Sequence, residues 1–211
     1  LKKNVVGTLR HINISWLTGG RAPMNIPLNW QNDLKFGGGV LFSHAPHVID
    51  YVERLFGKIK GVVASLRVVK RNGAAAEDTC DLLCTLESGV KVNISISNVL
   101  PNARGHAIEV YGDKGSLSLI NSDLRNSIYE FQLFHFPLSA KKSIEIPIFV
   151  SREARRHADS RLPLFMEVAK EFISAIKRHK VRGPSFLDGL RVQEVLDAAR
   201  ASDRLKREIS V

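Results

Sequence analysis

A short segment near the start of the chain, from Gly37 to Asp50, collects residue types that could do chemistry. It opens on three consecutive glycines, and glycine lets a backbone turn sharply and approach a ligand closely. His44 and His47 follow, where an apolar pattern predicts a helix. The partial positive charge at a helix N-terminus disfavours a protonated imidazole, and a neutral imidazole accepts protons near physiological pH. His47 is therefore a candidate general base, the group that oxidation of an alcohol to a ketone requires.

Each polar residue of this segment also has a structural interpretation. On spacing alone, a histidine at position 47 is more typical of a helix start or a packed core than of a general base, whereas His44 either borders a site or lies on the surface. Asp50, three residues after His47, could face the same side of the helix, but it is interpreted as a helix-packing or solvent-facing carboxylate rather than as a catalytic acid. Ser43 is predicted to cap the helix, with Pro46 in its first turn, where a missing N–H costs least.

The segments around this stretch predict the elements that must position it. Alternating apolar residues predict strands over residues 5–17, 59–69, 78–86, 91–99, 107–111, 116–120, 128–136 and 143–150. Helices are predicted to end at Phe56, to span residues 164–178, and to start from a capping box at Ser185. The last helix is expected to turn five residues inward: Leu187, Leu190, Val195, Leu196 and Ala199. The pattern predicts an α+β domain, with a large, mostly antiparallel open sheet and helices packed on one face.

A loop of residues 18–32, rich in glycine, proline and asparagine, precedes the glycine run. Loops of this length in compact domains are often binding loops. Arg21 is interpreted either as a ligand for a phosphate or carboxylate or as a free surface residue. Trp30 is interpreted either as a packing residue or as an indole that lies beside a sugar ring.

The composition narrows the function classes. The chain has 211 residues, of which 44% are hydrophobic, and no apolar segment long enough to cross a membrane is present. Its net charge is +10, but the basic residues are scattered and the densest stretch, residues 151–161, contains no aromatic residue, so nucleic-acid binding is not expected. Two cysteines, Cys80 and Cys84, are predicted to be reduced thiols of one strand, which favours the cytoplasm.

Several familiar site signatures are absent from the sequence. It contains no strand–GxGxxG–helix unit, no P-loop, no cysteine–histidine set with zinc spacing and no GxSxG elbow. No metal site is expected. The chain also opens without a methionine or a secretory signal, which suggests that it was cut from a longer protein.

The order of the motifs resembles that of a known family. Trp30, the glycines 37–39, His47 and Asp50 stand in sequence, and further matches lie at 77–79, 88–89, 108–117, 186–199 and 202. In this combination the chain is similar, over nearly its whole length, to the C-terminal domain of the glucose–fructose oxidoreductase, inositol 2-dehydrogenase and rhizopine-catabolism (Gfo/Idh/MocA) family.

The resemblance implies a fold, a cofactor and partners. Family members bind NAD or NADP in an N-terminal Rossmann domain, which also supplies a catalytic lysine. Their C-terminal domain covers the nicotinamide, holds a sugar, cyclitol or nucleotide-sugar, and often forms a homo-oligomer through its open sheet. Residues 1–211 are thus expected to be one substrate-binding and oligomerisation domain whose NAD(P)-binding domain is missing, so that this fragment alone would be inactive.

The resemblance also assigns residues. It places the family's catalytic histidine at His47. Seven further residues are expected to bind the substrate or shape its pocket: Arg21, Asn29, Trp30, Gly38, Gly39, Ser43 and His44.

Two positions depart from the family pattern. Ser43 stands where an aspartate is usual, and Ala45 stands where a glycine is usual. Serine can hydrogen-bond a hydroxyl group but cannot serve as an anionic partner. Three alternatives follow: the enzyme works with His47 alone, its substrate differs, or the chain is a non-catalytic binding or scaffold relative.

Overall fold

A computed structural model describes residues 4–70, 73–122, 130–149, 159, 161–179 and 183–211. These residues form a nine-stranded sheet with the order β8-β7-β6-β5-β1-β4-β3-β2-β9. The strands are β1 Leu9–Leu17, β2 Ile59–Arg67, β3 Thr79–Leu86, β4 Lys91–Ser97, β5 Gly105–Gly112, β6 Gly115–Asn121, β7 Gln132–Pro137, β8 Ile144–Ile146 and β9 Ile209–Ser210. The helices are η1 Trp30–Asn32, η2 Leu34–Phe36, α1 Val40–Ser43, α2 Ala45–Phe56, α4 Leu162–Arg178 and α5 Phe186–Leu205.

The strand β1 lies near the middle of the sheet and connects its two halves. It pairs antiparallel with β5 and parallel with β4, and the other neighbouring strands pair antiparallel. Ile12 and Ile14 on β1 are fully or almost fully buried, whereas Asn13 between them is only half-buried. This alternation confirms a sheet with one face packed on the core.

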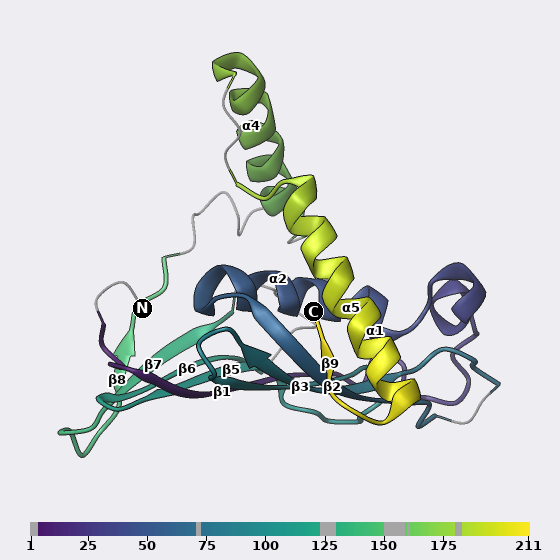
Figure 1. Cartoon of the computed structure of the whole chain (residues 1–211), viewed down its shortest axis with the longest axis horizontal. Coiled ribbons are helices and arrows are strands. Elements are labelled where there is room, and N and C mark those ends of the chain that lie inside the picture. Colours follow the sequence, from purple (N-terminus) through teal and green to yellow (C-terminus); the bar gives the residue numbers. More distant parts are fainter. Residues whose placement is uncertain (1–3, 71–72, 123–129, 150–158, 160, 180–182) are drawn as a thin grey trace.

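The core lies between this sheet and the helices α1, α2 and α5, which cover one of its faces (Figure 1). The α2 residues Val48, Ile49 and Val52 are fully buried, because their spacing places them on one side of the helix. Val195 and Leu196 of α5 join the same core. The helical layer therefore holds the N-terminus of α2, with His44 and His47, against the end of β1 on the packed face.

Two predictions about the helices are wrong. Ser43 does not cap α2: it is the last residue of the short helix α1, and His44 occupies the N-cap position without a side-chain hydrogen bond. The α5 residues Leu187 and Leu190 are not inward, since 76% and 56% of their surface is exposed. The first turns of α5 extend beyond the sheet, so only the second half of that helix meets the core (Figure 1).

Other local predictions are confirmed. The capping box at Ser185 forms, with the side chain of Asp188 accepting from the Ser185 backbone. Cys80 and Cys84 are buried free thiols on β3, and burial raises the pKa of both. Most of the basic stretch 151–161, and part of the predicted strand 128–136, lie outside the described residues.

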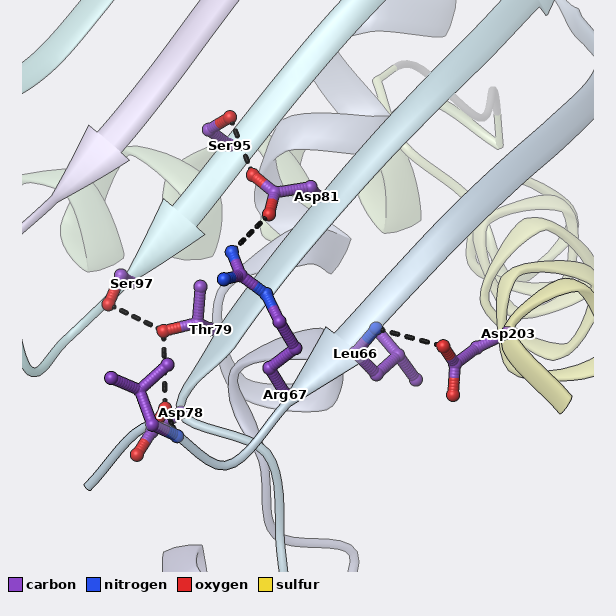
Figure 2. Close-up of polar contacts among 9 residues, drawn as sticks. Leu66, Arg67, Asp78, Thr79, Asp81, Ser95, Ser97 and Asp203 are labelled. Carbon is purple, nitrogen blue, oxygen red and sulfur yellow. Dashed lines mark hydrogen bonds and ion pairs between the residues drawn. The ribbon is translucent and has the colours of Figure 1, made fainter. Parts of the chain in front are cut away.

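None of the described helices covers the opposite face of the sheet, which carries a polar network. Figure 2 shows Asp81 of β3 accepting hydrogen bonds from Arg67 at 2.6 Å and Ser95 at 2.8 Å. Farther along the same face, Asn13 of β1 donates to Glu109 of β5 at 2.9 Å. Neighbouring strands are thus tied together by side chains as well as by their backbones.

The helix α4 projects away from the sheet (Figure 1). None of its residues is buried. Its apolar stripe is consequently exposed, with five of its members at 51–68% exposure: Phe165, Val168, Phe172, Ile173 and Ile176. Among the described residues, no other element covers this stripe.

Candidate functional site

The glycine run is held in place by Glu77. Gly39 has φ +107°, and a Cβ at this position would overlap the Glu77 carboxylate. The backbone oxygen of Glu77 accepts from the N–H of Val40 at 3.0 Å, and its Oε1 accepts from the N–H of Leu41 at 3.1 Å. Glu77 thereby caps α1, and burial raises the pKa of its carboxyl. Only glycine allows the chain to pass this close to the buried carboxylate.

The loop before the glycine run is also internally fixed. Arg21 donates to Gln31 at 2.5 Å and to Asn32 at 3.2 Å. The Asn29 side chain accepts from the Gln31 N–H at 3.0 Å and so caps η1. Arg21 is therefore not a free surface residue, and both it and Asn29 organise the loop.

Two other predicted site residues also belong to this loop region. Gly38 packs against the loop, because a Cβ there would overlap the carbonyl oxygens of Trp30 and Asp33. The Trp30 indole remains 54% exposed and lines an open hollow with Leu28, Phe36 and several polar neighbours. Figure 1 shows this segment, which contains η1 and η2, at one end of the molecule, beyond the start of α1.

His44 and His47 meet at the junction of α1 and α2. His47 is exposed and His44 is half-buried. The Ser43 hydroxyl lies 2.7 Å from the Gly39 carbonyl oxygen and 2.8 Å from Nδ1 of His44. Burial and the charge of His47 lower the pKa of His44. Asp50, one turn on, forms an ion pair with Arg54 at 3.7 Å.

An aromatic cluster lies under these two histidines. Trp16 of β1 contacts His44 edge-on, at a ring-centroid distance of 5.0 Å, and His47 at 6.2 Å. On β5, His106 stacks on Trp16 with an interplanar angle of 3° and a centroid distance of 4.9 Å. The Tyr51 hydroxyl of α2 lies 3.1 Å from Nε2 of His106. The spacing of His44, His47 and Tyr51 puts all three on one side of the helical segment.

Burial keeps the deeper part of this cluster uncharged. His106 is only 8% exposed, and burial lowers its pKa to about 4. Burial also raises the pKa of Tyr51, so its hydroxyl keeps its proton. The arrangement provides a neutral aromatic floor beneath two imidazoles, one of which opens to solvent. Imidazole side chains in such a setting can serve as a general acid or base toward a hydroxyl group.

We expect His106 to make the stability of the protein pH-dependent. Its pKa in the folded protein is about 4, below the ordinary histidine value of 6.5. The unfolded chain therefore binds more protons, so stability is full above pH 6.5 and falls as the pH drops toward 4. The free energy of unfolding should decrease by about 1.4 kcal/mol per pH unit in this window.

Urea unfolding at a series of pH values measures this slope. The His106→Gln variant removes the titrating ring and should flatten the slope, although it should also lower stability at pH 7. A variant that keeps the full wild-type slope would show that another group causes the loss.

The glycine run does not form a phosphate site. The N–H groups of the first two residues of α1, Val40 and Leu41, already donate to Glu77. The described residues also contain no group of three or more histidine, cysteine or acidic side chains placed to hold a metal ion. Within the same residues, no helix combines the length and hydrophobicity needed to span a bilayer.

Reasoning from the sequence missed four residues of this site. Trp16 and His106 appear in the sequence as ordinary strand residues, and Tyr51 as an ordinary helix residue. Their meeting depends on which strands pair, which alternation alone does not reveal. Glu77 belongs to a motif that was noticed, but its role as the cap of α1 follows only from the structure.

Comparison with known proteins places the chain in a family. Residues 1–211 match the family model described as "Oxidoreductase family, C-terminal alpha/beta domain" of the Gfo/Idh/MocA group. An uncharacterised oxidoreductase of Synechocystis sp. is 30% identical over 223 residues, which cover 100% of this chain and 60% of that protein. The chain thus spans about 60% of the length of this relative.

Solved structures agree on the fold. An oxidoreductase domain protein from Kribbella flavida superposes with a TM-score of 0.81 at 22% identity, covering 100% of this chain and 60% of the other. Levoglucosan dehydrogenase, in complex with NADH and levoglucosan, gives a TM-score of 0.80 at 20% identity with the same coverage. Together with the match to the family model, these findings show that the chain belongs to the Gfo/Idh/MocA oxidoreductase family, as its C-terminal alpha/beta domain.

Proposed function

We propose that the intact protein transfers a hydride between a sugar-like alcohol and NAD or NADP, and that this chain supplies the substrate site. The observation that carries the proposal is the pair His44 and His47 at the start of α2, one of them exposed, above the neutral floor of Trp16 and His106. The family match supports the reaction class. A solved relative in complex with NADH and levoglucosan supports the substrate class.

In this proposal His47 accepts the proton of the substrate hydroxyl during oxidation and returns it during reduction. Its exposed ring can reach a ligand without rearrangement of the core. The glycines 37–39 let the chain pass close to the bound sugar, and Trp16 keeps bulk water from the inner side of the imidazoles. The bound nicotinamide ring would supply the hydride acceptor.

We further propose that the cofactor is held mainly outside these 211 residues. The N–H groups of Val40 and Leu41, at the start of α1, already donate to Glu77 and are not available to phosphates. The exposed apolar stripe of α4 offers a surface against which a dinucleotide-binding domain could pack. The open, polar face of the sheet is then left to contact a second copy of the chain. Sedimentation of the intact protein tests this, and we expect a dimer or a larger assembly.

The test is an assay of the full-length protein with NAD and NADP against a panel of sugars, anhydrosugars and cyclitols. We expect reduction of at least one cofactor by a member of the panel. If no member is oxidised and the protein still binds a sugar, the scaffold alternative replaces the enzymatic one.

A further inference from the structure

Ser43 and His44 stand side by side at the end of α1, and the proposed function does not yet use either for proton transfer. Trp16 packs against the rings of both His44 and His47, at 5.0 and 6.2 Å between centroids. The two imidazoles therefore belong to one site. What distinguishes them is that only His44 is held by a side-chain hydrogen bond within the described residues.

The hydroxyl of Ser43 determines which nitrogen of His44 carries the proton. Its single hydrogen is donated to the Gly39 carbonyl oxygen at 2.7 Å, an acceptor that has no proton to give. The Ser43 oxygen lies 2.8 Å from Nδ1 of His44, and with its hydrogen already donated it can only accept a hydrogen bond from that nitrogen. Nδ1 must therefore be the donor. A neutral imidazole has one N–H, so Nε2 of His44 is an unprotonated acceptor.

The surroundings keep His44 in this neutral form. Burial lowers its pKa, and the charge of His47 on α2 lowers it further. From the sheet, β1 presents the uncharged Trp16 indole, and β5 presents His106 beyond it. No described residue donates a hydrogen bond to Nε2, so this nitrogen is available to an incoming proton.

We propose that His44 is the second member of an imidazole pair that handles the substrate proton: Ser43 holds its ring with Nε2 free, and this nitrogen shares with His47 the proton that leaves the substrate hydroxyl. The inference rests on the proposed function. During oxidation the alcohol O–H bond breaks and its proton goes to the pair. The carbinol C–H bond breaks, its hydride goes to the oxidised nicotinamide, and the C=O bond forms. The pair gains one positive charge and later releases the proton to water.

His44 is thus a catalytic partner of His47, and Ser43 is the positioning residue that acts through the His44 ring. Because a charge on one ring disfavours a charge on the other, we expect the pair to take up one additional proton at a time. The His44 and His47 pair therefore returns to its starting protonation state when the substrate proton is released to water. The serine at position 43, which cannot act as a carboxylate partner, contributes by fixing the tautomer of the neighbouring ring.

The first test is nitrogen NMR of the full-length protein with labelled histidine. We expect the His44 signals of an Nδ1–H tautomer at neutral pH. Ser43→Ala should yield a mixture of tautomers, and Ser43→Thr, which retains a hydroxyl, should restore the wild-type signals. His47→Gln should raise the pH at which His44 takes up a proton. An Nε2–H tautomer in the wild type, or no change in Ser43→Ala, would overturn the proposal.

The second test is the pH profile of kcat in the same protein. His44→Gln should lower kcat by roughly tenfold, leave KM nearly unchanged and shift the acid limb of the profile. A loss confined to KM, or an unmoved acid limb, would assign His44 a structural role only. Absence of turnover in the wild type would instead overturn the proposed function, while the NMR signals would still report whether Ser43 fixes His44.

Discussion

Replacing His47 by glutamine is expected to lower kcat/KM of the full-length protein by about a hundredfold to ten-thousandfold, the contribution of a general base. Glutamine retains a polar end of similar reach but cannot accept a proton near neutral pH. Because the base acts in the transition state, the loss should fall mainly on kcat. Initial rates of cofactor reduction, at saturating and limiting substrate, separate the two constants.

The same variant should fold normally, since the His47 side chain is exposed and makes no hydrogen bond among the described residues. Substitutions at such positions change the free energy of unfolding by about 0.5 kcal/mol or less. Asp50→Asn is a matched control on the same helix, because it breaks an ion pair at 3.7 Å without touching the imidazoles. Equal losses in both variants would mean that the helix surface, rather than the ring, supports turnover.

Replacing Gly39 by alanine is expected to destabilise the protein by about 3 kcal/mol and to abolish activity together with the fold of the segment. Two effects combine in this variant. Alanine is strained at φ +107°, and its Cβ would displace the buried Glu77 carboxylate that caps α1. Denaturant unfolding of the wild type and the variant measures the difference.

Gly37→Ala is the control for backbone strain alone. This glycine also has a positive φ, of +71°, but a Cβ there would meet nothing within 4 Å. We expect a cost of about 1 kcal/mol, since only the left-handed conformation is penalised. If the two variants lost the same stability, contact with Glu77 would not be the reason for a glycine at position 39.

The layered architecture could be predicted from the sequence because it depends on local patterns. Alternating residues on β1 and β4 specify one buried face, and the turns at 87–90 and 112–115 join antiparallel neighbours. The parallel pairing of β1 with β4 could not be predicted in this way. Alternation specifies a face but carries no information about which distant strand lies alongside.

In the candidate site, too, local features could be predicted from the sequence and contacts between distant residues could not. The glycine run and His47 were recognisable from residue types and spacing, because a helix start follows directly. The cap of α1 was not, since Glu77 is distant in sequence and reaches Leu41 only in the folded chain. Ser43 looked like a helix cap because serine is a frequent N-cap, but the helix breaks at His44 and leaves Ser43 at the end of the preceding turn.

The exposure of Leu187 and Leu190 has a related cause. Their helical spacing indicates an apolar face, and a helix with such a face normally buries it. In α5 only the second half of that face meets the sheet, while the first half extends beyond it toward α4 (Figure 1). The apolar pattern was read correctly, but this part of the α5 face lies outside the core formed by the described residues.

In the proposed reaction, a hydride leaves the carbinol carbon of an alcohol bound at the site of His44 and His47. The most direct measurement follows deuterium from the carbinol carbon of an oxidised substrate into the cofactor, by mass spectrometry after a single turnover of the full-length protein. We predict one deuterium in the reduced nicotinamide, and a much slower transfer in His47→Gln. Reduced cofactor without deuterium, or transfer at an undiminished rate in His47→Gln, would contradict the account.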